Sequence, residues 1–109
     1  FSYMNLAKKK CVPCEGSIPP LSESAAKKYL KETTGWNLVK NKITRDFKFK
    51  DFKEAIKFLN KIAEVSESEN HHPDILIYSW NKVKLEFTTH AIKGLSENDF
   101  IMAAKINKL

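Results

Sequence analysis

The chain has 109 residues and a mass of 12.6 kDa, enough for one domain around one hydrophobic core. Its net charge of +6 comes from 18 lysines and a single arginine, Arg45, interspersed with 13 acidic residues. Sequence-specific nucleic-acid readers usually depend on arginine, so we expect a solvated lysine-rich surface and no direct nucleic-acid ligand. The apolar runs are too short for a transmembrane helix, and residues 1–10 lack the pattern of a signal peptide.

Residues 1–20 are predicted to form an extended arm, because several prolines and a glycine interrupt them and no period is visible. Cys11 and Cys14 in this arm form a Cys-x-x-Cys pair. Two cysteines are too few for a disulfide scaffold, so we expect a reducing, cytoplasmic compartment, with a leader lost before Phe1 as the alternative. Zinc binding and redox chemistry are weaker interpretations, because no second ligand pair and no preceding strand accompany the cysteines.

A helix, a pair of strands and a second helix follow. Ser22 is a suitable N-cap for a helix over 22–33, and Gly35 is expected to cap its end. Residues 36–39 and 43–49 predict strands, the second from its alternation of apolar and polar positions. Lys40-Asn41 suits a tight hairpin, because asparagine tolerates positive φ.

The second half of the chain repeats this order. A helix is predicted over 51–68, from a capping-box pattern at Asp51 to a stop before Pro73. Strands are predicted over 75–80 and 83–90, with a hairpin at Asn81-Lys82, and a last helix starts at 96–99. The predicted fold class is therefore α+β: a two-layer sandwich, ordered α-β-β-α-β-β-α, with three helices on one face of a four-stranded antiparallel sheet. Residues 21–109 form this single domain.

The three histidines are placed where this fold could bring them together. His71 and His72 follow the second helix, and His90 ends the last strand. Glu67 lies one helical turn before His71, and Asp99 lies in the first turn of the last helix. Imidazole exchanges protons near neutral pH, so such a pocket could run proton-transfer chemistry. The alternative is that these are surface histidines and that Asp99 is present only because the dipole of the helix favours an acidic residue at its N-terminus.

Several motifs stand in a specific order along the second half of the chain: Glu67-Ser68-Glu69-Asn70-His71-His72-Pro73, Trp80, Lys82-Val83, Thr89-His90, Gly94-Leu95-Ser96 and Asp99. Their order and spacing resemble the pterin-4a-carbinolamine dehydratase family. Gly35-Trp36 and the Cys-x-x-Cys arm also resemble parts of some members, so the resemblance covers nearly the whole chain. One departure is visible: the stretch from Pro73 to Trp80 is one residue longer than in the animal enzymes, so no pterin contact is assigned between Asp74 and Trp80.

The resemblance implies a dehydratase that removes water from 4a-hydroxytetrahydropterin and gives the quinonoid dihydropterin, without a metal or an organic cofactor. It implies that the pterin carbinolamine is made by aromatic amino acid hydroxylases, within tetrahydrobiopterin recycling. By the same resemblance, His71 and His90 would act as acid or base, and His72 would orient the pterin. The supporting or substrate-binding positions would be Glu67, Pro73, Thr89, Ala91, Ile92 and Asp99, with Asp99 expected to tune His90.

The family also implies assembly. Its members form dimers and tetramers, so we expect a homodimer or homotetramer. Animal members act in addition as dimerisation cofactors of a homeodomain transcription factor, through the helices that otherwise make the enzyme's tetramer. A non-catalytic binding module of the same fold is therefore the alternative to the enzyme. Three histidines with two carboxylates nearby favour the enzyme, because a pure scaffold has no need of them.

Overall fold

The computed structural model describes residues 6–11 and 19–109. Within these ranges the chain forms, in order, η1 (Leu6–Lys8), α1 (Glu23–Lys31), β1 (Asn37–Val39), β2 (Lys42–Lys48), α2 (Phe52–Glu69), β3 (Asp74–Tyr78), β4 (Lys82–Phe87), η2 (His90–Ile92) and α3 (Glu97–Asn107). The predicted order of three α-helices and two strand pairs is confirmed. No helix of the described residues is both long enough and apolar enough to cross a membrane.

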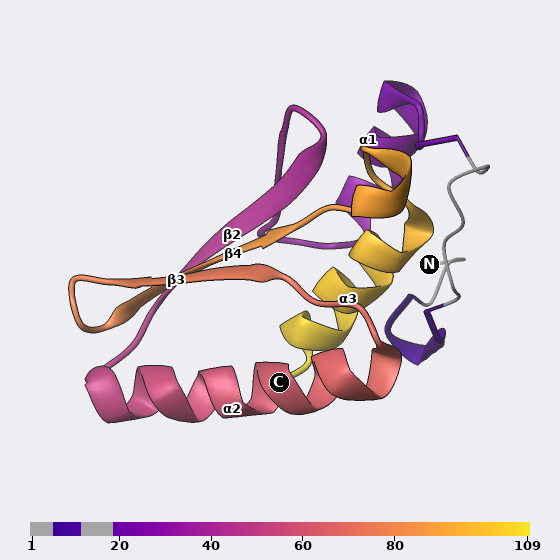
Figure 1. The fold of residues 1–109 in the computed structure, drawn as a ribbon. Helices are drawn as coiled ribbons and strands as arrows, with labels where there is room; N and C mark the ends of the chain where they lie inside the picture. Colours follow the sequence, from indigo (N-terminus) through magenta and orange to yellow (C-terminus); the bar gives the residue numbers. More distant parts are fainter. Residues whose placement is uncertain (1–5, 12–18) are drawn as a thin grey trace.

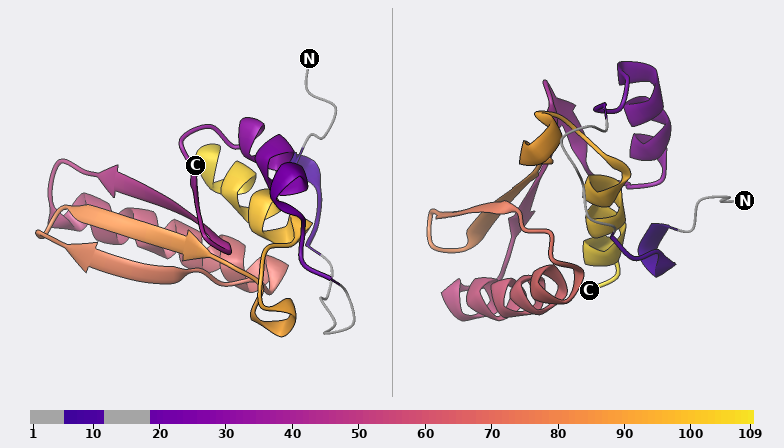
Figure 2. Two further views of the ribbon diagram at one scale, coloured as in Figure 1. Left: turned by 90° about the horizontal axis from the view of Figure 1, so that it is seen from above. Right: turned by 45° about the vertical axis from the view of Figure 1, so that its right-hand side comes forward.

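The four strands form one antiparallel sheet in the order β1-β2-β4-β3, so the two hairpins pair through β2 and β4. Opposite residues share a face of the sheet, and Ile43 opposite Phe87 and Phe47 opposite Val83 mark the face that carries the core. Figures 1 and 2 show α2 running along this face, with α3 between α2 and α1. The α+β sandwich predicted from the sequence is confirmed.

The core is centred on β4 and α3. Val83, Leu85 and Phe87 are fully buried on one side of β4, and the polar residues that alternate with them face the other side. Nearly every residue of α3 from Asn98 to Ile106 is buried, because α1, α2 and η1 contact this helix and its apolar residues share one core cluster with those of the sheet. A helix enclosed on all sides is a rigid support for residues at its first turn.

Several local predictions differ from the structure. The predicted strand 75–80 and hairpin at Asn81-Lys82 become a strand that ends at Tyr78 and a turn over residues 79–81, with positive φ at Ser79 and Trp80. The helix predicted to 33 ends at Lys31, and Gly35, with φ +93°, lies in the turn that follows instead of capping the helix. In the first hairpin the positive φ falls on Lys40, not on Asn41. The last strand ends at Phe87, since the chain then bends into η2 and cannot continue in the ladder to His90.

The described part of the N-terminal arm is docked rather than extended. Leu6 in η1 is buried in the core, and Lys105 Nζ donates to the carbonyl oxygen of Ala7 at 2.9 Å. The backbone N–H of Cys11 donates to Glu69 Oε1 at 2.8 Å. The arm therefore contacts both the end of α2 and α3. Cys14 lies outside the described residues.

A polar cluster links this arm to α1 and α3. Glu97 Oε2 accepts hydrogen bonds from Lys9 Nζ at 2.9 Å and from the Tyr29 hydroxyl at 3.0 Å. The bond from Lys9 lowers the pKa of Glu97, and burial raises the pKa of Tyr29. Because the carboxylate form is favoured in the folded state, Glu97 stabilises the fold once the pH is above its unfolded pKa.

We expect this stabilisation to be lost as the pH falls through the lowered pKa of Glu97. In Glu97→Gln the free energy of unfolding should be lower than in the wild type at neutral pH and should depend less on pH in the acid range. Urea unfolding at a series of pH values measures both. The control is Glu64→Gln, which removes an exposed carboxylate of α2. Equal acid dependence of Glu97→Gln and wild type would contradict the prediction.

Candidate active site

The end of α2 sets the directions of the first two histidines. Asn70 adopts the left-handed conformation, with φ 52° and ψ 42°, and ends the helix. The backbone N–H groups of Asn70 and His71 both donate to the carbonyl oxygen of Ser66, which closes the last turn. Pro73 then keeps the chain extended toward β3. His71 and His72 consequently leave the helix in different directions.

Asp99 is the polar group of the site that has the most hydrogen-bond partners. Its side chain is fully buried at the third position of α3, where it forms a capping box with Ser96. Asp99 Oδ2 accepts hydrogen bonds from the backbone N–H of Ser96 and from the Thr89 hydroxyl, both at 2.9 Å. Its other oxygen, Oδ1, lies 2.6 Å from His71 Nε2. A carboxylate buried to this extent needs these partners to offset the loss of hydration.

The His71 ring is fixed by this carboxylate and by an aromatic neighbour. It stacks on Phe87 with a centroid distance of 5.9 Å and an interplanar angle of 9°. Only 13% of the His71 side chain is exposed. An ionised carboxylate can only accept, so Nε2 carries the proton in this pair and Nδ1 is the nitrogen left for other chemistry.

His72 lies in a different environment. Its Nε2 is 2.5 Å from Glu67 Oε2, but the two side chains are 53% and 77% exposed. The predicted proximity of Glu67 to an imidazole is thus found, with His72 as its partner. Water competes for both groups, so this pair holds its imidazole less firmly than Asp99 holds His71.

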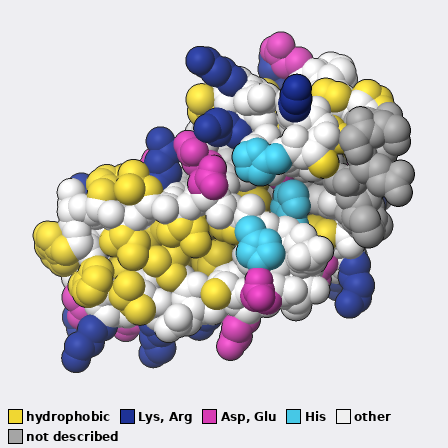
Figure 3. All heavy atoms as spheres, viewed as in Figure 1, with side chains coloured by type: hydrophobic (Ala, Val, Ile, Leu, Met, Phe, Trp, Pro, Cys, Tyr) yellow, Lys and Arg dark blue, Asp and Glu magenta, His cyan; other side chains and the backbone are white. Residues whose placement is uncertain are grey.

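His90 begins η2 and is exposed. Asp99 was expected to tune His90, but the carboxylate pairs with His71 instead, because the exit of α2 brings His71 Nε2 to Oδ1 while Oδ2 accepts from Thr89 and Ser96. The side chain of His90 has no hydrogen-bond or ion-pair partner among the described residues. Figure 3 shows that the three histidines nevertheless gather on one face, as the sequence predicted.

The remaining predicted positions differ in what they offer a ligand. Thr89 supports Asp99, and its backbone N–H donates to the carbonyl oxygen of Gly94. The N–H of Ile92 donates to the carbonyl oxygen of Thr89, and the Ile92 side chain is buried. These two amides are therefore engaged within the loop, while Ala91 is exposed and Pro73 half-buried at the surface.

Two supports of the site were missed from the sequence. Phe87 lies in the strand predicted over 83–90, but its stacking under His71 was not predicted. The role of Ser96 could have been read from Ser-x-x-Asp at 96–99, a capping-box pattern that turns the Asp99 carboxylate toward its own helix start. The described residues contain no group of three or more histidines, cysteines and acids arranged to hold a metal ion.

Comparison with known proteins identifies the family of this chain. The sequence model described as pterin 4 alpha carbinolamine dehydratase matches residues 19–109. The chain belongs to this family. A relative from Nitrosomonas eutropha that carries the family's name is 49% identical over 106 residues, covering 96% of this chain and 93% of the relative.

Two further members of the pterin dehydratase family are similar to this chain. Pterin-4-alpha-carbinolamine dehydratase 2, mitochondrial, of Arabidopsis thaliana is 43% identical over 113 residues, which are 99% of this chain and 60% of the plant protein. A crystal structure from Brucella melitensis, described as a transcriptional coactivator/pterin dehydratase, superimposes with a TM-score of 0.77 at 37% identity. It covers 82% of this chain and 96% of the Brucella chain.

The pairing of His71 with Asp99 predicts one tautomer. Long-range ¹H–¹⁵N NMR at a pH where His71 is neutral should show its proton on Nε2, because the carboxylate accepts there. Asp99→Asn should give a mixture of tautomers, since an amide can donate as well as accept. Glu67→Gln is the matched control, which changes the partner of His72 and should leave His71 unchanged. A proton on Nδ1 of wild-type His71 would contradict the prediction.

Proposed function

We propose that this chain catalyses the dehydration of 4a-hydroxytetrahydropterin by histidine acid–base chemistry. In this reaction the bond between C4a and the hydroxyl oxygen breaks, N5 loses its proton, and water leaves with the quinonoid dihydropterin as product. The leaving oxygen needs a proton donor and N5 needs a proton acceptor. Membership in the dehydratase family supports the reaction, and three histidines on one face supply side chains suited to both transfers.

The observation that carries the proposal is the buried network of His71, Asp99 and Thr89. A carboxylate bound to one ring nitrogen fixes the orientation and the tautomer of the imidazole, so proton exchange takes place at Nδ1. Phe87 under the ring prevents it from tilting. We assign the acid and base roles to His71 and His90 together, with His90 acting from the η2 side of the same face.

His72 and Glu67 are assigned to binding. Both are exposed on the same face as the other histidines, so they can contact a ligand that lies over His71. A pterin offers ring N–H groups and a carbonyl oxygen, which match a carboxylate and an imidazole. Neither transfer needs a metal or an organic cofactor. We further expect the substrate to come from aromatic amino acid hydroxylases in tetrahydrobiopterin recycling, in the cytoplasm.

Replacement of the histidines should separate chemistry from folding. His71→Ala is expected to lower kcat for freshly generated carbinolamine by about 10²–10⁴-fold, the usual contribution of a positioned acid or base. His71→Ala/His90→Ala should approach the spontaneous rate. Stopped-flow absorbance measures both rates, and Lys61→Ala, on an exposed position of α2, is the control. A double variant with the wild-type rate would exclude the mechanism.

A binding role is the second candidate, because the Brucella protein is described as a transcriptional coactivator as well as a pterin dehydratase. The two candidates differ in what they need from the histidines. A binding module would keep the sheet and helices but would gain nothing from the His71–Asp99 pair. Absence of rate enhancement over spontaneous dehydration in the wild-type protein would favour the binding role.

We also expect a homodimer or homotetramer. Several large apolar side chains are half or more exposed on the described surface, among them Phe52, Leu76 and Trp80, and Figure 3 shows an apolar area beside the histidines. Burial of such side chains in a partner copy removes apolar surface from water. Sedimentation equilibrium should therefore give a mass of two or four chains, and a single 12.6 kDa species would contradict this expectation.

A further inference from the structure

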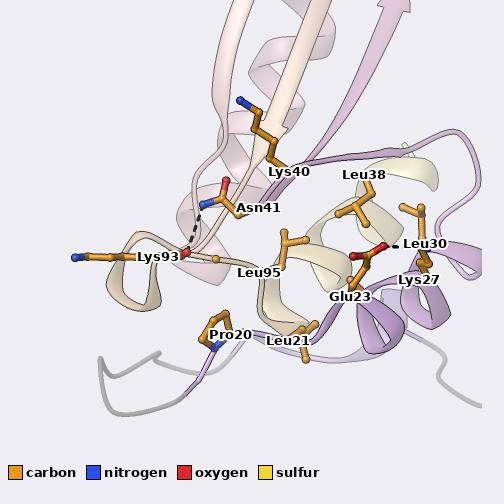
Figure 4. A pocket seen from close by; sticks show the side chains of 12 residues that line it. Pro20, Leu21, Glu23, Lys27, Leu30, Leu38, Lys40, Asn41, Lys93 and Leu95 are labelled. Carbon is orange, nitrogen blue, oxygen red and sulfur yellow. Dashed lines mark hydrogen bonds and ion pairs between the residues drawn. The ribbon is translucent and has the colours of Figure 1, made fainter.

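A cavity of about 530 Å³ lies between α1, the turn that joins β1 to β2, and the loop after η2. The three histidines do not line it. Four leucines form its apolar wall, and they come from four different segments of the chain: Leu21, Leu30, Leu38 and Leu95. Figure 4 shows these side chains around one hollow. The volume and the apolar wall are typical of a small-molecule site.

The rim of this cavity is positively charged. Lys27, Lys40 and Lys93 stand around it, whereas Glu23 is its acidic lining residue. The Glu23 carboxylate forms an ion pair with Lys27, whose Nζ lies 3.0 Å from Oε1. Lys40 and Lys93 are exposed and have no carboxylate partner among the described residues. Figure 4 shows both side chains extending outward from the rim, so an anion bound there would draw their flexible stems and ammonium groups toward the cavity.

The two turns that carry these lysines are held together. Asn41 Nδ2 donates to the carbonyl oxygen of Lys93 at 3.3 Å, and the Thr88 hydroxyl donates to the carbonyl oxygen of Asn41 at 2.8 Å. Lys40 and Lys93 both have left-handed backbones, with φ 58° and 55°, where glycine or asparagine is the usual choice. The backbone conformation of these two turns does not favour lysine over other residues. The positive charge of Lys40 and Lys93 is therefore the property that calls for an explanation.

We propose that this cavity is a second ligand site, for a small molecule with an apolar ring body and an anionic phosphate, sulfonate or carboxylate group. The body packs against the four leucines, and the anion lies between Lys40 and Lys93. The site adjoins the loop that carries His90, three residues before Lys93, so its ligand contacts the support of one proposed acid–base residue. The binding does not depend on the dehydratase reaction.

The test is an NMR titration of the ¹⁵N-labelled full chain with 1-naphthyl phosphate. Saturable shifts are expected at the amides of Lys40, Asn41, Lys93 and Gly94. Inorganic phosphate and 1-naphthol each supply only half of the required chemistry, so both should bind at least about tenfold more weakly. Shifts centred on His71 and His72, or no saturable shifts at all, would overturn the proposal.

A charge-matched pair of variants tests the lysines. Lys40→Gln/Lys93→Gln should weaken naphthyl phosphate binding by about tenfold, as expected for two partly exposed ion pairs. Lys53→Gln/Lys57→Gln removes the same charge from the exposed side of α2 and should bind like the wild type. Equal weakening in both double variants would show a general charge effect. Undiminished binding by Lys40→Gln/Lys93→Gln would show that the rim lysines do not hold the anion. Either result overturns the proposal.

Discussion

A single buried carboxylate organises the candidate active site. Asp99 is removed from water entirely, so the fold must supply hydrogen-bond donors to it. These donors come from three parts of the chain: the start of α3, the segment that follows β4, and the exit of α2. Because α3 is enclosed by the other elements, these donors are held against a rigid support. The requirement to satisfy one carboxylate thus fixes the position of His71.

The turn at the end of α2 places two adjacent histidines, His71 and His72, in different environments. The left-handed Asn70 and the following Pro73 direct His71 inward onto Phe87 and leave His72 beside the solvent. An enclosed imidazole with a buried carboxylate partner has a defined orientation and tautomer, whereas an exposed imidazole can adjust to a ligand. This division matches the roles we propose, in which His71 transfers protons and His72 binds the pterin.

Local patterns predicted the elements well and their junctions less well. Ser22 and Asp51 marked helix starts and the alternation around Val83 to Phe87 marked a buried strand face, because these signals depend on nearby residues alone. The partner of Asp99 was predicted wrongly, since the choice between His71 and His90 depends on how three distant segments meet. The docking of Leu6 was missed for the same reason: nothing local shows that α3 leaves a place for it.

The contact between Pro20 and Gly94 shows that the residues just before α1 are part of the folded unit. A Cβ placed on Gly94 would lie 2.6 Å from the Cβ of Pro20, so glycine is required there for the two segments to meet. The backbone N–H of Leu21 also donates to the carbonyl oxygen of Leu95. Residues just before α1 therefore brace the far side of the loop that presents His90. A shortened chain starting at Leu21 would keep every helix and strand from α1 onward, yet it would lose part of the wall that holds this loop in place.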